Sequence, residues 1–385
     1  MNGIEIRQIT DKRGMDAFVG FYYDLYRGCE YAVPYLRNDE LATLDPQRNA
    51  SFECCEAAYF MAYRDGKPVG RVAAIINRRA NERWNSRTVR FGWFDFIDDR
   101  DVSAALLHAV EQWGRARGMD EIAGPMGFTD MDREGMLVEG FDRLSTHYIN
   151  YNYPYYPKHI ESMGGWVKDN DYMEYRVAIP DVVPDKFRKV AEMVGQRYNL
   201  RVRKFTRREL VSGGYGERIF ELVNATYNNL YGYSHLSMRQ IDSLIDGYIK
   251  KADLDLITGV VDMNEGGRLV GFGITFPSIS RAMQHTRDGR LLPFGWWHVL
   301  RALRWHRTDT VDLLLIGVLP EYRAKGANAL IFNDLIPRFR RHGFKWAEAM
   351  PQMESNEHVR SQWQYLEAEQ HRRHRCYRKE IAIDN

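Results

Sequence analysis

The sequence predicts an α/β chain of two tandem domains, and three observations support this fold class. The 385 residues are enough for two domains of ordinary size. A composition of 44% hydrophobic and 28% charged residues is typical of globular chains. One order of elements, strand–strand–strand–helix–strand–helix–strand, can be traced twice by hydrophobic periodicity. A repeat of domain length suggests duplication.

The first copy begins with a hairpin around the Asp65-Gly66 turn, and Asp98 or Asp99 is available as the N-cap of its first helix. The two final strands of the copies, 173–179 and 376–383, resemble each other. The first copy is predicted as strands at 59–64, 68–79, 90–97, 121–126 and 173–179, with helices at 101–118 and 155–165. The second copy is predicted as strands at 256–262, 268–276, 310–318, 345–350 and 373–383, with helices at 328–343 and 357–369.

The third strand of the second copy leads into a polar turn that predicts an anion site. Leu313–Val318 is an apolar run of strand length, and Pro320 to Gly326 is a short glycine-bearing turn before a helix. Such a turn directs free backbone N–H groups and the helix dipole at one spot. Arg323 and Lys325 add positive charge.

The turn lacks the P-loop and dinucleotide patterns but resembles the coenzyme A pyrophosphate loop of the GNAT superfamily of N-acyltransferases. That motif is Gln or Arg, two residues, Gly, one residue, then Gly or Ala. It stands here as Arg323-Ala324-Lys325-Gly326-Ala327-Asn328, so Asn328 departs from the small last residue. The element order also matches this family. The resemblance implies two tandem GNAT-like domains, 1–180 and 181–385, each a mixed, mostly antiparallel sheet flanked by helices.

The resemblance further implies how the second domain would hold acetyl-CoA or another acyl-CoA. Pantetheine would lie where the strands 310–318 and 345–350, which are the fourth and fifth in the order of the family, diverge, beside Val318. Backbone N–H groups from Arg323 to Asn328 would hold the pyrophosphate, and Asn356 matches a cofactor-contacting asparagine of the family. In the first domain Asp98, Asp99 and Asp101 occupy the place of the phosphate turn and would repel pyrophosphate, so that domain would instead shape the acceptor site.

Acyl transfer to an amine needs a base, oxyanion donors and an acid for the leaving thiolate. Glu348 on the fifth strand is the candidate base, with Glu354 as an alternative. In the family, the acid is often a tyrosine seven residues after the asparagine, but that position is Trp363 here. Tyr365 is the nearby candidate acid, on another helical face, and water is the alternative.

Three further stretches carry two interpretations each. Residues 291–307 predict an amphipathic helix, either packed on its own domain or forming a lid or a peripheral membrane contact. The basic run 371–375 predicts an exposed turn or a phosphate-binding patch. Asp130, Asp132 and Glu134 predict a solvated acidic loop or a pocket for a cationic amine.

Charge and composition restrict the partners. A net charge of +2 gives no electrostatic reason to expect nucleic acid as a partner. No signal peptide, transmembrane run or cysteine–histidine metal spacing is found, so we expect a reduced cytoplasmic protein without a metal. The oligomeric state and the acceptor are left open.

Three functions follow from these features. The first is an acyl-CoA-dependent N-acyltransferase, in particular an N-acetyltransferase, acting on a small-molecule amine. The second is an acyltransferase that uses aminoacyl-tRNA or a long-chain acyl-CoA. The third is a non-catalytic acyl-CoA-binding protein, which Asn328 and the missing tyrosine favour.

Overall fold

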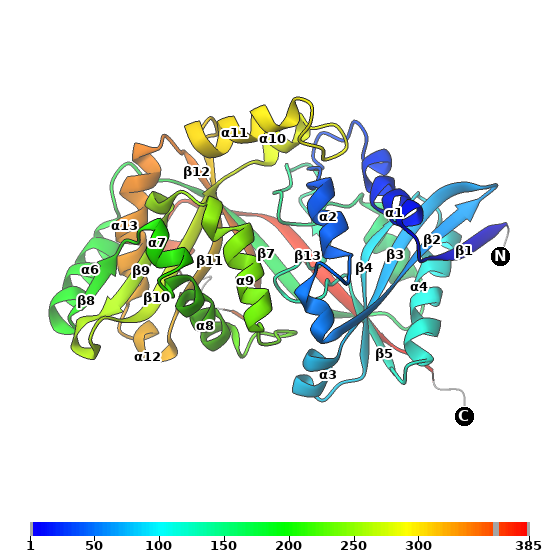
Figure 1. The fold of residues 1–385 in the computed structure, drawn as a ribbon, viewed down its shortest axis with the longest axis horizontal. Coiled ribbons are helices and arrows are strands. Elements are labelled where there is room, and N and C mark those ends of the chain that lie inside the picture. The colour runs from blue at the N-terminus through cyan, green and yellow to red at the C-terminus, as the bar shows by residue number, and fades with distance from the viewer. Residues whose placement is uncertain (1–2, 357–361, 383–385) are drawn as a thin grey trace. The chain divides into compact units, whose positions relative to one another are not determined.

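The computed structural model describes residues 3–356 and 362–382 of the chain and divides into two compact units (Figure 1). The described residues of the first unit are 3–173, 280–297 and 371–382. Those of the second unit are 174–279, 298–356 and 362–370. This division is not contiguous in sequence, unlike the expected domains 1–180 and 181–385. The functional roles assigned to those domains remain predictions.

The first unit has an antiparallel hairpin sheet that continues through one parallel pair. Its sheet order is β1-β2-β3-β4-β5-β13-β7, with β6 paired to β13. Its strands are β1 (Ile4–Ile9), β2 (Cys55–Arg64), β3 (Lys67–Asn77), β4 (Thr88–Phe96), β5 (Glu121–Gly124) and β6 (Met136–Glu139), with the starting part of β7 (Val167–Ala178) and most of β13 (Ala368–Glu380). Its helices are α1 (Lys12–Leu25), α2 (Arg37–Thr43), α3 (Arg78–Trp84), α4 (Arg100–Arg115), α5 (Tyr155–Ser162) and α10 (Ser280–Gln284).

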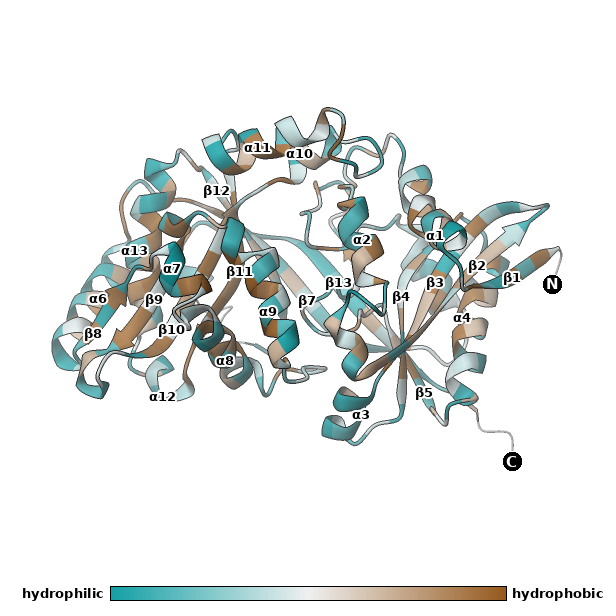
Figure 2. Cartoon of the chain, viewed as in Figure 1, coloured by the Kyte–Doolittle hydropathy of each residue, from teal (hydrophilic) through white to brown (hydrophobic). Residues whose placement is uncertain are grey.

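The second unit repeats the plan with the sheet order β7-β12-β11-β10-β9-β8. Its strands β9, β10 and β11 are strongly hydrophobic, as Figure 2 shows. Beyond the end of β7, its strands are β8 (Leu200–Arg203), β9 (Ile257–Asp262), β10 (Arg268–Pro277), β11 (Thr310–Val318) and β12 (Trp346–Met353). Its helices are α6 (Asp185–Arg197), α7 (Arg207–Val211), α8 (Tyr215–Tyr227), α9 (Met238–Gly247), α12 (Pro320–Arg323) and α13 (Asn328–Arg341), with most of α11 (Gly295–Trp305).

Helices cover both faces of each sheet. Glycines in the strands allow some of these helices to lie close to the sheet. In the first unit a Cβ on Gly70 would meet Leu106 of α4, while Arg71 reaches the other face and donates to the carbonyl of Phe18 in α1. In the second unit a Cβ on Gly273 would meet Ile331 of α13, and one on Gly317 would meet Thr226 of α8. The predicted α/β class, with a mostly antiparallel sheet flanked by helices, is confirmed.

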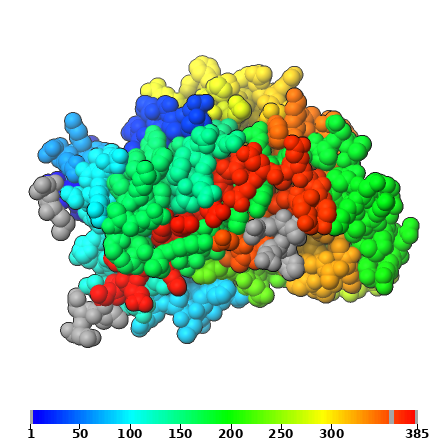
Figure 3. Space-filling view, turned by 180° about the vertical axis from the view of Figure 1, so that it is seen from behind, coloured from blue at the N-terminus to red at the C-terminus, as the bar shows by residue number. Residues whose placement is uncertain are grey.

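The closing strands of the two units are exchanged relative to the sequence order. The final strand β13 pairs with β5 of the first unit, from Tyr377↔Gly124 to Glu380↔Glu121. The end of β7, which precedes the second copy, instead lies next to β12 of the second unit. Part of β13 is visible in red on the rear face (Figure 3).

The basic run 371–375 was expected to be an exposed turn, and this expectation is wrong. It lies inside β13, where Arg372 is 1% exposed and His374 is fully buried. Arg373 and Arg375 form ion pairs with Asp171, whose side chain is fully buried. The basic run therefore belongs to a strand in which the charges of Arg373 and Arg375 are balanced by a carboxylate of the same unit.

The helix predicted at 357–369 is also not found as expected. Residues 357–361 lie outside the described part of the chain. After them, Trp363–Tyr365 form a 3₁₀ turn (η5), and β13 already begins at Ala368. Residues 368 and 369, which were included in the predicted helix, belong to β13 instead.

Candidate functional site

The strands β11 and β12 pair in parallel over only four residues and then diverge. The register runs from Thr310↔Trp346 to Leu313↔Ala349, whereas β11 continues to Val318 and β12 to Met353. Diverging parallel strands expose backbone groups to which an extended ligand can add as a strand does. This fork is the place where the sequence predicted the pantetheine arm.

The turn after β11 is fixed by one glycine and one buried tyrosine. Gly326 has a φ of +87°, a left-handed conformation that side chains rarely adopt, and a Cβ there would lie 2.7 Å from Val190 of α6. Tyr322 is 2% exposed and its hydroxyl donates to the carboxylate of Asp262 at 2.8 Å. The turn therefore holds one conformation directly at the end of β11.

Arg323 is committed to the loop itself, which corrects the expectation that its guanidinium simply adds charge for an anion. Its Nε donates to the carbonyl of Val318 at 2.8 Å, and its Nη2 donates to the carbonyl of Thr226 at 3.0 Å. The ammonium of Lys325 lies 4.1 Å from the ring centroid of Tyr322. Arg323 is thus an anchor that ties the turn to β11 and α8.

Fewer of the six backbone N–H groups from Arg323 to Asn328 are available to an anion than the sequence predicted. The N–H groups of Arg323, Gly326 and Ala327 donate to carbonyls at or just before the turn, and those of Ala329 and Leu330 donate to the carbonyls of Gly326 and Ala327. Ala327 is the N-cap residue of α13, and no described side chain caps this helix. Asn328 is the first residue of α13, so the start of a 14-residue helix faces the end of the turn without an internal anion.

The corresponding helix of the first unit is capped differently. α4 follows β4 as α13 follows β11, but the carboxylate of Asp99 accepts hydrogen bonds from the N–H groups of Asp101 and Val102. Arg64 pairs with the same carboxylate at 2.7 Å. An internal carboxylate thus occupies the helix start at which a phosphate would bind, which supports the prediction that this unit holds no coenzyme A.

Glu348 lies one residue before the fork opens. It is in register with Asp312 on β11, and both side chains are buried, with Glu348 7% exposed. Arg176 of β7 places its Nη1 3.8 Å from the Glu348 carboxylate and stacks over Trp346. Sequence reasoning did not single out Arg176, although a lone arginine within the apolar strand 173–179 was a usable signal.

The structure places Tyr365 beside α6 and Asn356 just after β12. Tyr365 is 37% exposed, and its ring packs against Lys186 and Phe187 of α6. The N–H of Asn356 donates to the carbonyl of Met353. Trp363, at the position where the family often has a tyrosine, is buried and donates to Gln352.

The acidic loop of the first unit is partly buried rather than fully solvated, contrary to the simpler of its two interpretations. The carboxylate of Asp132 accepts from the N–H of Thr129 at 2.9 Å. Burial raises the pKa of Asp130 well above its usual range, with Glu134 adding to the effect, and burial raises the pKa of Glu134 to about 7. A carboxyl group with a pKa of about 7, such as that of Glu134, is partly protonated at neutral pH and is therefore a weaker site for a cationic amine.

The fold and the fork define the class of structure: the chain has the GNAT fold in a tandem arrangement. Two solved structures cover almost all of it. One is a tandem GNAT protein from the clavulanic acid biosynthesis pathway, with a TM-score of 0.58, 12% identity and coverage of 99% of this chain and 100% of that one. The other is a GCN5-related N-acetyltransferase from Sphaerobacter thermophilus, with a TM-score of 0.53, 12% identity and coverage of 100% and 98%.

Two known protein sequences are similar to this chain. Protein YghO of Escherichia coli strain K12 is 26% identical over 389 residues, covering 98% of this chain and 95% of that protein. The bacterial ceramide synthase of Caulobacter vibrioides is 24% identical over 293 residues, covering 73% and 71%. No protein-family model matches the chain.

The buried Glu134 predicts a pH dependence of folding. Its folded pKa of about 7 lies above the ordinary value of 4.5, so the folded state retains a proton that the unfolded state loses between these values. Stability should therefore fall as pH rises from 4.5 to 7, and Glu134→Gln should reduce this fall. Urea unfolding across this window measures it. The exposed Glu139→Gln should leave the slope of the wild type, and equal slopes for all three proteins would contradict the assignment.

Proposed function

We propose that the chain is an acyl-CoA-dependent N-acyltransferase and that the second unit holds the co-substrate. The observation that carries this proposal is the start of α13, which has no side-chain cap and follows a turn fixed by Gly326 at the end of a diverging strand. Helix starts of this kind bind phosphate groups. One structural neighbour is a GCN5-related N-acetyltransferase, which points in the same direction.

The residues of the second unit have separate roles in this proposal. The N–H of Asn328 and the dipole of α13 hold the pyrophosphate, while Arg323 and Tyr322 keep the turn in place. The thioester supplies an activated acyl group. Glu348, next to the last paired residues of the fork, takes the proton from the attacking amine. A backbone N–H near Val318 stabilises the developing oxyanion.

The acid for the leaving thiolate is water in this proposal. Tyr365 packs on α6 and has no described contact with Glu348 or the fork, so its role as acid has no geometric support. Arg176 has a different role in this proposal. It lies within 4 Å of Glu348 and balances the charge of the base.

The phosphate site can be tested with Asn328→Asp, which adds a negative charge at almost constant shape. We expect acyl-CoA affinity to fall at least tenfold, because the carboxylate repels pyrophosphate, a loss of about 1.4 kcal/mol. Stability should not fall, since an acidic residue in the first turn favours a helix. Isothermal titration with acetyl-CoA, palmitoyl-CoA and free coenzyme A measures the affinity. The exposed Gln47→Glu adds the same charge in the other unit and should bind normally; equal binding by both variants would exclude this site.

The base can be tested with Glu348→Gln, which keeps the size of the side chain and removes its charge. We expect kcat to fall by about 10²–10⁴ while acyl-CoA affinity is retained. Steady-state kinetics with a panel of primary amines and a thiol reagent for released coenzyme A measure it. Glu354→Gln tests the alternative base in the same assay. If Glu348→Gln retains full turnover, the base is elsewhere, and binding without turnover by the wild type would favour the non-catalytic alternative.

A long-chain acyl group is the second candidate, and α11 is the observation that favours it. The helix and the segment before it expose large apolar side chains at Leu292, Phe294, Trp296, Trp297, Leu300 and Trp305. Val299 and Ala302 of the helix are buried, whereas Trp297 and Leu300 are exposed. The yellow segment that contains α11 lies at the surface in Figure 3.

The exposed face of α11 has the composition of a helix that lies on a lipid surface. Phe294 is 77% exposed, and the basic Arg301 and Arg304 accompany the tryptophans. No helix within the described ranges is long and apolar enough to cross a membrane. One relative is a bacterial ceramide synthase, an enzyme named for its lipid product. We therefore propose that this chain takes long acyl chains and contacts membranes through α11.

This proposal predicts vesicle binding that depends on α11. The chain should sediment with vesicles of phosphatidylcholine and phosphatidylglycerol, and Phe294→Ser with Trp296→Ser should weaken binding several-fold. Val182→Ser removes an equally exposed apolar side chain elsewhere and should bind like the wild type. Equal sedimentation of all three proteins, or stronger stabilisation by acetyl-CoA than by palmitoyl-CoA, would contradict the long-chain proposal.

A further inference from the structure

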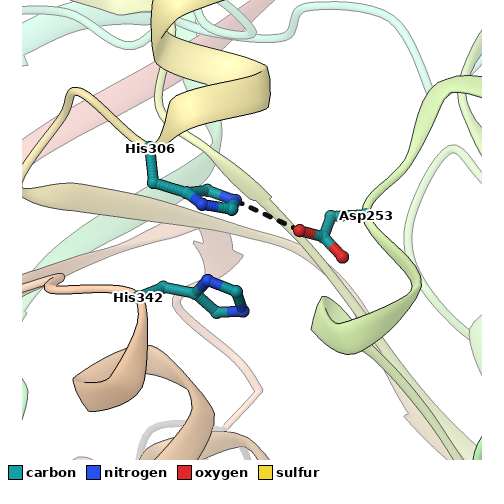
Figure 4. Close-up of side chains that lie close together, drawn as sticks. All are labelled: Asp253, His306 and His342. Atoms are coloured by element: carbon teal, nitrogen blue, oxygen red, sulfur yellow. Dashed lines mark ion pairs between the residues drawn. The ribbon is translucent and has the colours of Figure 1, made fainter.

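Three metal-ligating side chains meet in the second unit although they are far apart in sequence. Asp253 precedes the 3₁₀ turn before β9, His306 follows α11, and His342 follows α13. One ligand atom of each lies within 4.8 Å of the others. Figure 4 shows His306 and Asp253 facing each other, with the ring of His342 beside that of His306. The two ring centroids are 4.3 Å apart.

His306 faces the carboxylate of the same group. Its Nε2 lies 3.1 Å from Oδ2 of Asp253. An imidazole nitrogen without a proton offers the lone pair that a metal ion requires, and a carboxylate oxygen beside it adds a second ligand atom.

His342 is oriented by a second carboxylate, as metal-bound histidines commonly are. Oδ2 of Asp255 lies 2.8 Å from Nε2 of His342, which leaves Nδ1 for an ion. Asp255 also pairs with Arg338 and, at 3.7 Å, with Arg341. Its charge is therefore balanced without the ion, so Asp253 is the carboxylate that would neutralise a cation.

We propose that Asp253, His306 and His342 form a site for a divalent transition metal ion of the zinc class. Two imidazole nitrogens and one carboxylate oxygen suit zinc, whereas magnesium and calcium need mostly oxygen ligands. Ligand atoms of a tetrahedral zinc ion are roughly 3.3 Å apart, so any of the three distances that exceeds this value, up to the 4.8 Å limit, would shorten on binding. The fourth position is filled by water.

The location indicates a stabilising ion rather than a group that touches the acyl donor. α13 begins at the predicted phosphate turn and ends beside His342, and its 14 residues span about 20 Å. The ion would join the ends of α11 and α13 to the segment before β9. This inference does not depend on the proposed acyltransferase activity.

The test is zinc binding by the full chain after treatment with a chelator. Competition with a zinc indicator should give one site per chain, and His306→Ala and His342→Ala should each weaken it at least 100-fold. The exposed His108→Ala is the matched control and should bind like the wild type. Asp255→Asn, which keeps the contact but not the charge, should weaken binding about 10–100-fold. Bound Co²⁺ should give the visible absorption of tetrahedral coordination in the wild type but not in the ligand variants.

Thermal unfolding separates a metal site from an ordinary hydrogen bond. Zinc should raise the midpoint of the wild type and of His108→Ala, and leave those of His306→Ala and His342→Ala unchanged. If His306 only donates to Asp253, zinc and chelator will both leave the wild-type midpoint unchanged, which overturns the proposal. Equal zinc affinity of the wild type and the double variant of His306 and His342 would also overturn it.

Discussion

The short parallel ladder between β11 and β12 is the constraint on which the rest of the second unit depends. Four paired residues hold the strands together, and beyond Leu313 and Ala349 they diverge. The turn at Gly326 and the start of α13 follow directly from the free end of β11, and Glu348 lies just inside the last pairs. A longer ladder would close the opening and leave the helix start facing other backbone. Strand pairing that stops early therefore creates the site.

The two units show how one plan can carry different chemistry. Both have a strand that pairs in parallel for a few residues and leads to a long helix. In the first unit that helix is stabilised by its own carboxylate, Asp99, which uses the N–H groups within the chain. In the second unit the start of the helix has no described side-chain cap. The difference is a local electrostatic one, and the fold tolerates either solution.

Much of the fold could be predicted from the sequence because periodicity and turn residues are local signals. The hairpins, α4 with its Asp99 cap, and the β11–α13 connection are found where expected. The exchange of β7 and β13 could not be predicted, because the two closing strands resemble each other and either can complete either sheet. The buried run 371–375 misled for a related reason: its charges are balanced by Asp171, about 200 residues earlier in the chain.

The candidate site was predictable only in part. The loop motif located the turn, but the use of Arg323 on the carbonyls of Val318 and Thr226 depends on α8, which the pattern did not reveal. Trp363–Tyr365 form a 3₁₀ turn, so the helical spacing used to place Tyr365 relative to Trp363 does not hold. His306 and His342 lack any telling spacing to Asp253, since three separate elements bring them together. Sequence patterns identify motifs within one element better than sites shared among several.

The exchanged strand has a consequence for how the chain folds during synthesis. Domains generally fold from the N-terminus as they leave the ribosome. Here the sheet of the first unit includes residues 371–380, so its β5 edge has no partner until nearly the whole chain has been made. The unit that is translated first is therefore completed last. An exposed strand edge of this kind invites pairing with other chains, so the early-made half depends on the prompt arrival of the final strand.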